Sequence, residues 1–292
     1  MPERRLHEAE RLRHTEHVMG TVFSFDVRHE PTRAVRAALG EAVAWLHHVD
    51  RVFSTYRPHS AISRIGDGSM NVTDAPPEVE RVLRMCERAE SATRGCFSAR
   101  AGRRLDPSGL VKGWAVEQAY GLLRAAGAPN SLVNGGGDIR LGGEPAPGSP
   151  WRVGVSDPCG PGRLLTTVEG RDFAVATSGG AERGSHILDP RTGRPAHRLL
   201  AATVTGPDLA WADSWATAAV VQGPDAHTWI ATQPGYELLT VDLDGRARRS
   251  GGFPLAAPAR GPPPPPGSAP RGGPSPPGPA NPSGAAAAPT PG

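Results

Sequence analysis

The sequence is poor in cysteine and almost devoid of lysine. Its 292 residues include 3 cysteines, an odd number without the spacing of a zinc site, which favours free thiols in a reducing compartment. Residues 1–17 contain no apolar run of signal-peptide length, so neither secretion nor direct membrane insertion is expected. These absences together predict a cytoplasmic protein.

The chain also lacks a strong excess of one charge. Its formal net charge is +3, and its basic residues are scattered among acidic ones, so nucleic acid is not an expected partner. Among the 32 Lys and Arg residues, Lys112 is the single lysine, which leaves 31 arginines. Lys112 lies in a glycine-flanked segment, where a compact ammonium binds differently from a planar guanidinium.

Composition divides the chain into three parts. Residues 1–17 are dense in Arg, Glu and His and are interpreted as a polar extension. Residues 18–250 have the apolar content of a folded domain. From residue 251 to residue 292 the chain is rich in Pro, Gly, Ala and Ser, and we predict a disordered tail because such a segment buries little apolar surface.

Hydrophobic periodicity predicts helices mixed with strands in the central part. Apolar residues recur at helical spacing from Val35 to Val49 and from Val79 to Cys86. Further helices are predicted near residues 110–126, 210–221 and 224–232. Strands are predicted at residues 21–28, 131–134, 139–141, 151–156, 164–168, 173–177, 201–205 and 236–242. Without a regular alternation of strand and helix, the pattern indicates an α+β fold.

Two glycine-containing segments are candidates for binding a nucleotide. In residues 134–138, three glycines precede Asp138, so backbone amides can approach a ligand closely; a plain hairpin turn is the alternative. Residues 106–115 predict a loop that enters a helix, where free amides and Lys112 would attract phosphate. An ordinary helix cap beside an exposed lysine explains this second segment equally well.

Hydroxyl, histidine and carboxylate side chains follow later in the chain. Thr177 and Ser178 precede His186, which would be able to deprotonate an attacking hydroxyl or else satisfy a local hydrogen bond. Residues 189–193 have the chemistry of a turn. Asp213 and Thr217 lie one helical turn apart and suit a hard cation such as Mg²⁺, although a helix cap and a packing residue are the alternative.

Taken in order, these segments resemble the ApbE family of FAD:protein FMN transferases. The resemblance extends over about residues 19–222 and rests on the order of its motifs. These motifs occupy residues 19–21, 53–56, 60–64, 106–115, 134–138, 177–179, 186–193 and 212–217.

The resemblance implies a T-fold-like α+β architecture with FAD held in a cleft. It implies that Asp213, Thr217 and the main-chain carbonyl near Val111 hold Mg²⁺, and that His186 faces the phosphates as the candidate base. The other residues that it implies at the FAD site are Met19, Ser54, Thr55, Tyr56, Asp106, Lys112, Gly135, Gly136, Gly137, Asp138, Thr177 and Ser178.

The chain departs from the family pattern in one region. Only residues 98–105 separate the segment at Phe97 from Asp106, where family members commonly carry a longer insert. Ser98 replaces an aspartate and Ser108 replaces a glycine of the pattern. This shortening leaves the phosphate-side residues intact and bears on the shape of the adenine pocket. The lipobox of the many exported relatives is also missing.

The activity that the resemblance implies is transfer of FMN from FAD to a Thr or Ser hydroxyl of an acceptor protein, with release of AMP. Two alternatives remain open. Water in place of the acceptor hydroxyl would make the chain an FAD pyrophosphatase that releases FMN and AMP. A non-catalytic flavin-binding module would carry the same glycine and hydroxyl loops without needing a metal.

Overall fold

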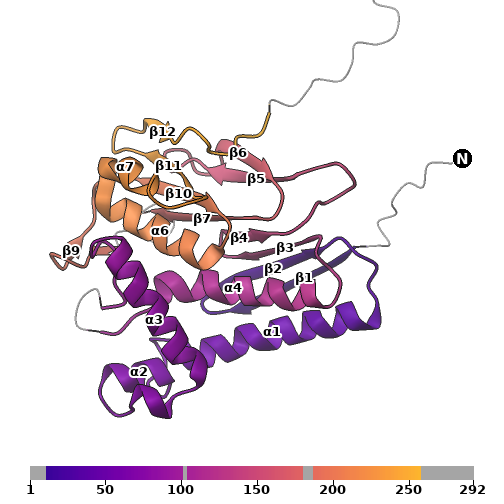
Figure 1. Cartoon of the computed structure of the whole chain (residues 1–292), viewed down its shortest axis with the longest axis horizontal. Helices are drawn as coiled ribbons and strands as arrows, with labels where there is room; N and C mark the ends of the chain where they lie inside the picture. The colour runs from indigo at the N-terminus through magenta and orange to yellow at the C-terminus, as the bar shows by residue number, and fades with distance from the viewer. Residues whose placement is uncertain (1–10, 101–103, 180–186, 258–292) are drawn as a thin grey trace, which may run out of the picture. The chain divides into compact units, whose positions relative to one another are not determined.

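The computed structural model describes residues 11–100, 104–179 and 187–257 and shows the predicted α+β fold (Figure 1). In this part of the chain, an eight-stranded antiparallel sheet has the order β1-β2-β3-β4-β7-β10-β11-β12. Its strands are β1 (Leu12–Val18), β2 (Thr21–Val27), β3 (Ser131–Gly135), β4 (Asp138–Leu141), β7 (Phe173–Gly179), β10 (Ala201–Gly206), β11 (Glu237–Val241) and β12 (Ala247–Arg249). Two short pairs stand apart from it: β5 (Trp151–Ser156) with β6 (Leu164–Gly170), and β8 (Leu188–Asp189) with β9 (Arg194–Pro195).

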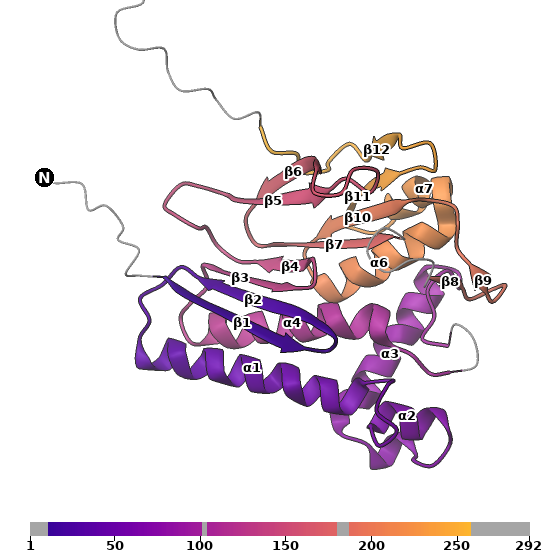
Figure 2. The same cartoon turned by 180° about the vertical axis from the view of Figure 1, so that it is seen from behind.

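Helices pack against one face of this sheet. The long helices are α1 (Arg33–Phe53), α3 (Pro77–Ala92), α4 (Ser108–Ala125) and α6 (Leu209–Gln222). Short helices are α2 (Ala61–Gly66), η2 (Val72–Asp74), η3 (Gly223–Asp225) and α7 (Ala226–Ile230). Helix α4 contacts β3 and β4, and α6 contacts β7 and β10, while α1 packs along α4 (Figure 2). None of the described helices is both long and apolar enough to cross a membrane.

The sheet separates two apolar cores. Ala174 and Ala176 of β7 point into the helical core, whereas Val175 between them points to the opposite face. There it meets Trp151 and Val168 of the β5–β6 pair. Side chains of a strand alternate between the two faces, so one strand contributes to both cores. This double burial explains why β7 and β10 are rich in small and β-branched residues.

Sequence periodicity predicted the long helices correctly. Helix α1 begins after Thr32, whose side-chain oxygen accepts a hydrogen bond of 3.2 Å from the Val35 N–H, and it buries Val35, Leu39 and Val49 as predicted. Helix α6 is different because nearly all its residues are buried between α4 and the sheet. A helix buried on all sides shows no apolar stripe, so its sequence alone does not tell which face meets which neighbour.

Both proposed domain limits need correction in the described residues. Residues 12–17, assigned above to a polar extension, belong to β1, an edge strand paired along its length with β2. At the other end, ordered structure continues past residue 250: Phe253 is buried, and Leu255 forms a β-bridge with Val168. The rest of the proposed tail, residues 258–292, lies outside the described residues.

Candidate active site

Helices α4 and α6 lie antiparallel and approach each other closely at Gly113. A Cβ atom added to Gly113 would lie 2.4 Å from the Leu209 carbonyl oxygen and 3.0 Å from the Asp213 Cβ atom. One turn earlier, a Cβ atom on Gly109 would lie 3.6 Å from the Thr217 hydroxyl oxygen. Residues four apart share a helix face, so the two glycines form a groove into which α6 fits. This groove faces the proposed cation ligands Asp213 and Thr217.

Asp213 and Thr217 do lie on one face of α6, as their spacing predicted. Asp213 is 3% exposed, and its Oδ2 atom accepts a hydrogen bond of 3.2 Å from the Gly113 N–H. The Thr217 hydroxyl is 3.1 Å from the Ser178 hydroxyl at the end of β7. Carboxylate and hydroxyl oxygens from a helix and a strand end therefore gather beside the start of α4.

Lys112 forms an ion pair with Asp138. Its Nζ atom is 2.5 Å from Asp138 Oδ2, and the Asp138 side chain is 1% exposed. The other carboxylate oxygen accepts a hydrogen bond of 3.1 Å from the Thr177 N–H. Asp138 thus joins α4 to the adjacent strands β4 and β7. We call Lys112, Asp138, Thr177, Ser178, Asp213 and Thr217 the polar cluster.

The three glycines before Asp138 form a tight hairpin turn between β3 and β4. Gly136 and Gly137 have φ angles of 62° and 98°, and the Asn134 side chain accepts a hydrogen bond of 2.8 Å from the Gly137 N–H. A Cβ atom on Gly136 would lie 2.4 Å from the Thr21 hydroxyl oxygen. The segment therefore forms a hairpin turn, and this turn lies beside the Asp138 of the polar cluster.

Met19 occupies the turn between β1 and β2, next to this glycine hairpin. Its φ angle is 55°, and that of the following Gly20 is 69°. A left-handed conformation costs a residue other than glycine, asparagine or aspartate on the order of 1 kcal/mol. Val18 pairs with Thr21, so Met19 and Gly20 form a two-residue hairpin loop, and the common loop of this length has positive φ at both residues. The sequence indicated Met19 only through the family resemblance.

Residues 54–56 follow the end of α1. Phe53 packs edge-on against Trp114 of α4, with ring centroids 5.7 Å apart, and this contact brings the segment to the α4 side of the fold. The Ser54 carbonyl accepts a hydrogen bond of 2.7 Å from the Ser60 hydroxyl. Thr55 is partly exposed, and Tyr56 is 95% exposed, so its ring presents aromatic surface to solvent.

The two remaining predicted site residues are Asp106 and His186. Asp106 is exposed in the loop before α4, where it accepts a hydrogen bond of 3.0 Å from the Ser108 N–H. His186 lies outside the described residues. Beyond it, Asp189 holds Arg191 through two side-chain hydrogen bonds, which lower the pKa of Asp189, so residues 189–193 form a turn as their composition indicated.

Sequence reasoning missed Glu117 and Arg140. Glu117 Oε1 accepts a hydrogen bond of 2.8 Å from Arg140 Nε, and Glu117 Oε2 accepts one of 3.0 Å from the Leu209 N–H. Glu117 stands four residues after Gly113, so it continues the face of α4 that meets α6. This spacing of four residues from Gly113 is the sequence feature that could have indicated Glu117.

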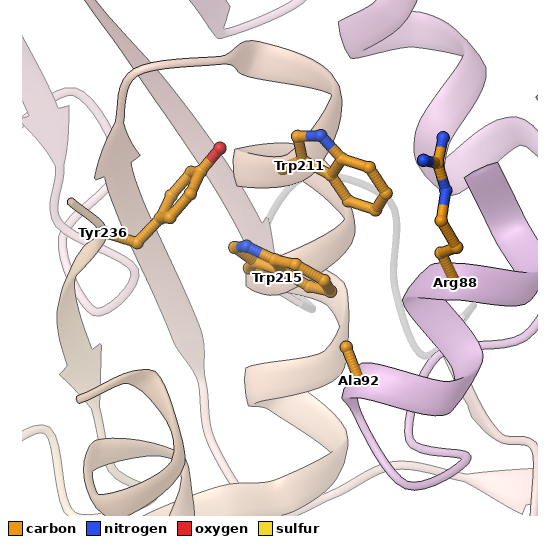
Figure 3. Close-up of a pocket in the computed structure, with 5 residues that line it drawn as sticks. All are labelled: Arg88, Ala92, Trp211, Trp215 and Tyr236. Atoms are coloured by element: carbon orange, nitrogen blue, oxygen red, sulfur yellow. The ribbon is translucent and has the colours of Figure 1, made fainter. Parts of the chain in front are cut away.

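A cavity is lined by side chains of α3, α6 and the residue before β11 (Figure 3). Trp211 and Trp215 are two residues away from Asp213 on either side, a rotation of about 200° around the helix axis. Their rings stack with centroids 5.3 Å apart. The cavity has a volume of about 350 Å³ and is lined by Arg88, Ala92, Trp211, Trp215 and Tyr236.

The polar cluster contains a carboxylate and hydroxyls, which are oxygen donors of the kind that hard cations take. The described residues contain no group of three or more His, Cys, Asp or Glu side chains that would enclose a metal by themselves. Mg²⁺ typically takes one or two carboxylates together with water and substrate phosphates. The carboxylate of Asp213 and the hydroxyl of Thr217 meet that requirement, and Lys112 adds positive charge nearby.

Together, the sheet and the polar cluster define a class: an α+β protein whose polar site lies between two closely packed helices and the ends of neighbouring strands. A sequence model of the ApbE family matches residues 19–103 and 98–240. The chain belongs to the ApbE family.

Curated relatives of the chain are named FAD:protein FMN transferases. The protein from Vibrio cholerae serotype O1 is 37% identical over 147 residues, which cover 47% of this chain and 44% of the relative. The protein from Rhodobacter capsulatus is 29% identical over 235 residues, which cover 74% of this chain and 42% of the relative. The chain thus aligns with less than half the length of either relative.

Solved structures of the family share the fold. The flavin transferase ApbE from Vibrio cholerae superposes with a TM-score of 0.72 at 24% identity, covering 83% of this chain and 97% of that one. The ApbE protein from Thermotoga maritima gives a TM-score of 0.74 at 22% identity, with the same coverage of 83% and 97%.

Proposed function

We propose that the chain transfers FMN from FAD to a Thr or Ser hydroxyl of an acceptor protein and releases AMP. The names of the curated relatives support flavin transfer. The observation that carries the proposal is the polar cluster, in which a lysine, a carboxylate and hydroxyls converge from α4, β7 and α6. Such a set suits the diphosphate of a dinucleotide.

Each proposed binding residue has a role in holding FAD. Lys112 neutralises phosphate charge while Asp138 orients its ammonium, and the amides at Gly135, Gly136 and Gly137 approach the nucleotide. Side chains at the other end border the flavin and adenosine portions. The Ser178 hydroxyl and the main chain at Thr177 face the phosphates, while the Thr177 hydroxyl lies 2.9 Å from the Thr203 hydroxyl. Met19, Ser54, Thr55 and Tyr56 border the flavin, and Asp106 contacts the adenosine side.

Asp213, Thr217 and the main-chain carbonyl of Val111 are the proposed Mg²⁺ ligands. When bound, Mg²⁺ would offset the negative charge that concentrates on the diphosphate during transfer. The close packing of Gly113 against α6 gives Asp213 a fixed place, because the Gly113 N–H donates to its carboxylate. A fixed carboxylate needs little reorganisation when charge develops.

The reaction is an in-line displacement at the FMN phosphorus. The acceptor oxygen forms a bond to that phosphorus while the bond to the bridging diphosphate oxygen breaks, and AMP leaves with that oxygen. The proton of the acceptor hydroxyl passes to His186, the proposed base, or to water. Positioning of the two substrates supplies most of the remaining acceleration.

The proposal is tested with FAD, Mg²⁺ and an acceptor protein that carries an exposed Ser or Thr. The expected product is a flavin-fluorescent acceptor band that survives denaturing electrophoresis, with one AMP released per flavin attached. Accumulation of AMP and free FMN without labelled acceptor would instead identify an FAD pyrophosphatase. Flavin binding without AMP release would identify a binding module.

Asp213→Ala is expected to lower the transfer rate by at least about 100-fold while FAD still binds, because the variant loses the carboxylate ligand of the metal. Transfer is measured by in-gel fluorescence and FAD binding by quenching of flavin fluorescence. Asp244→Ala, which removes an exposed aspartate beside Arg246, is the matched control. Equal activity of the two variants would remove Asp213 from the proposed site.

The cytoplasmic location predicted from the sequence belongs to this proposal. Its support is that Cys86, Cys96 and Cys159 are all free cysteines. Two of them are buried, and burial raises the pKa of the Cys86 thiol to about 12, so that thiol stays protonated.

A further inference from the structure

The Glu117 carboxylate connects three elements of the fold. It projects from α4 and accepts a hydrogen bond of 3.0 Å from the N–H of Leu209, the first residue of α6. Its second oxygen accepts one of 2.8 Å from Arg140 on β4. The first N–H groups of a helix have no partner within the helix, so an acceptor from another element fixes where that helix end lies.

Arg140 anchors this carboxylate to the sheet. Its side chain is 9% exposed, and its Nη1 atom donates to the carbonyl oxygens of Leu141 at 2.5 Å and Phe173 at 3.1 Å. The guanidinium also lies 4.8 Å from the centre of the Tyr120 ring. A guanidinium held from several sides has little freedom, so Glu117 in turn has one preferred position.

The same three elements carry the polar cluster. Lys112 lies on α4, Asp138 begins β4 two residues before Arg140, and Asp213 lies one turn after Leu209 on α6. Along the interface between the helices, Gly109 faces Thr217, Gly113 faces Asp213, and Glu117 bonds to Leu209. Two hydrogen bonds therefore join the helices, one from the Leu209 N–H to Glu117 and one from the Gly113 N–H to Asp213.

The local cap of α6 does not provide the same link. Asp208 accepts a hydrogen bond of 3.2 Å from the Trp211 N–H and so defines where the helix begins along its own chain. This contact does not join α6 to α4. A hydrogen bond between two helices fixes their axial register, and the bond from the Leu209 N–H to Glu117 does so at the first residue of α6, one turn from the bond between Gly113 and Asp213.

We infer that Glu117 is a positioning residue that fixes the register of α6 on α4 and thereby holds Asp213 and Thr217 beside Lys112. This inference rests on the proposed function for its effect on metal and substrate. Burial raises the pKa of Glu117 despite the adjacent Arg140, consistent with a carboxylate in a poorly hydrated position.

The test compares Glu117→Leu with the double variant Glu117→Leu/Arg140→Leu. The single variant leaves a buried guanidinium without its carboxylate, so a loss of stability is expected. Replacing both members of a buried ion pair by apolar residues often restores stability. The double variant therefore lacks the acceptor for the Leu209 N–H in a chain of near-native thermal stability. Glu41→Gln, at an exposed site on α1, is the control.

Two measurements read the register of α6 without relying on turnover. Amide hydrogen exchange across α6 in the protein without ligands is expected to be faster in both Glu117 variants than in wild type and Glu41→Gln. The Mn²⁺ affinity of the FAD-loaded protein, followed by electron paramagnetic resonance, is expected to fall by about 10-fold or more. FAD affinity without metal is expected to stay within about twofold of wild type, because Lys112 and Asp138 are retained.

The outcomes separate this inference from the proposed function. If the stable double variant shows wild-type exchange in α6 and wild-type Mn²⁺ affinity, Glu117 is merely structural and the inference is overturned. Faster exchange with weaker Mn²⁺ binding supports it. If the wild-type chain binds neither FAD nor Mn²⁺, the proposed function is wrong. The exchange data then still decide whether Glu117 fixes the register of α6 on α4.

Discussion

Lys112 has an unusually well-defined environment for a lysine. Its ammonium meets Asp138, which is 1% exposed and also accepts the Thr177 N–H. A carboxylate buried to this extent needs a cation or several donors to offset its lost hydration. The lone lysine of the chain is thus part of the native structure, apart from any role in binding phosphate.

Lys112→Met is expected to lower the free energy of unfolding by about 3 kcal/mol, because it leaves the buried Asp138 carboxylate without its cation. Urea unfolding measures the change. Arg84→Met is the control, since it removes an ion pair whose partners are 64% and 56% exposed, and it should cost less than about 1 kcal/mol. Similar losses in the two variants would show that the Lys112–Asp138 pair contributes little.

At the residue scale, the sequence identified individual residues of the polar cluster better than it identified the contacts between them. Asp213 and Thr217 share a helix, so their spacing alone predicted that they share a face. The Lys112–Asp138 pair joins residues on different elements, and no local pattern encodes that contact. His227 on α7 is a second example: its side chain is buried and lies 2.9 Å from the Thr240 hydroxyl of β11, a contact between different elements.

Among the contacts between helices and strands, the one between α4 and α6 leaves no room for a side chain at Gly113. A methyl group at Gly113 would overlap the backbone carbonyl of Leu209, and backbone cannot rotate away as a side chain can. Gly121 lies on the same helix with no atom within 4 Å of the position of an added Cβ atom. Gly113 and Gly121 therefore lie on the same helix, but only Gly121 has space for a methyl group.

Gly113→Ala is expected to lower the free energy of unfolding by about 1–3 kcal/mol, because the two helices must move apart. Gly121→Ala is expected to raise it by up to about 1 kcal/mol, because alanine favours the helix. Thermal and urea unfolding of both variants check this opposite pair of signs. Two changes of the same sign would contradict the close packing at Gly113.

β1, one of the strands that the sequence analysis missed, shows the limit of apolar periodicity. In β1, the partly buried positions alternate as expected for a strand, but two of them are His14 and Glu16. Glu16 lies 3.2 Å from His14 and 3.1 Å from His47 on α1, and these contacts lower the pKa of Glu16. Because the inward side chains of β1 are polar and form hydrogen bonds with neighbouring residues, the sequence of this strand resembles that of a polar extension.

Across the whole molecule, His227 links stability to pH. Burial lowers the pKa of His227 below its ordinary value of 6.5. The unfolded chain therefore binds a proton at this residue at a higher pH than the native chain does. Its contribution to stability is complete above about pH 6.5 and is lost as the pH falls from there through the lower native pKa.

His227→Gln is expected to flatten the loss of stability between pH 7.5 and pH 5.5, because glutamine keeps a polar contact to Thr240 without titrating. Unfolding in urea at several pH values measures the slope. His59→Gln, at an exposed site, should leave the slope unchanged. A wild-type slope in the His227 variant would assign the pH dependence to other groups.

The contacts that pair residues of α4 with residues of α6 restrict where the chain can gain or lose a residue. Inserting or deleting one residue inside either helix would turn everything beyond it by about 100°. Glycine would then meet bulky side chains, and the aspartate and threonine would swing towards the tryptophan-lined cavity. Changes in length are therefore expected in the segments that connect the elements and not inside α4 or α6, where one residue more or less would separate each glycine from its partner.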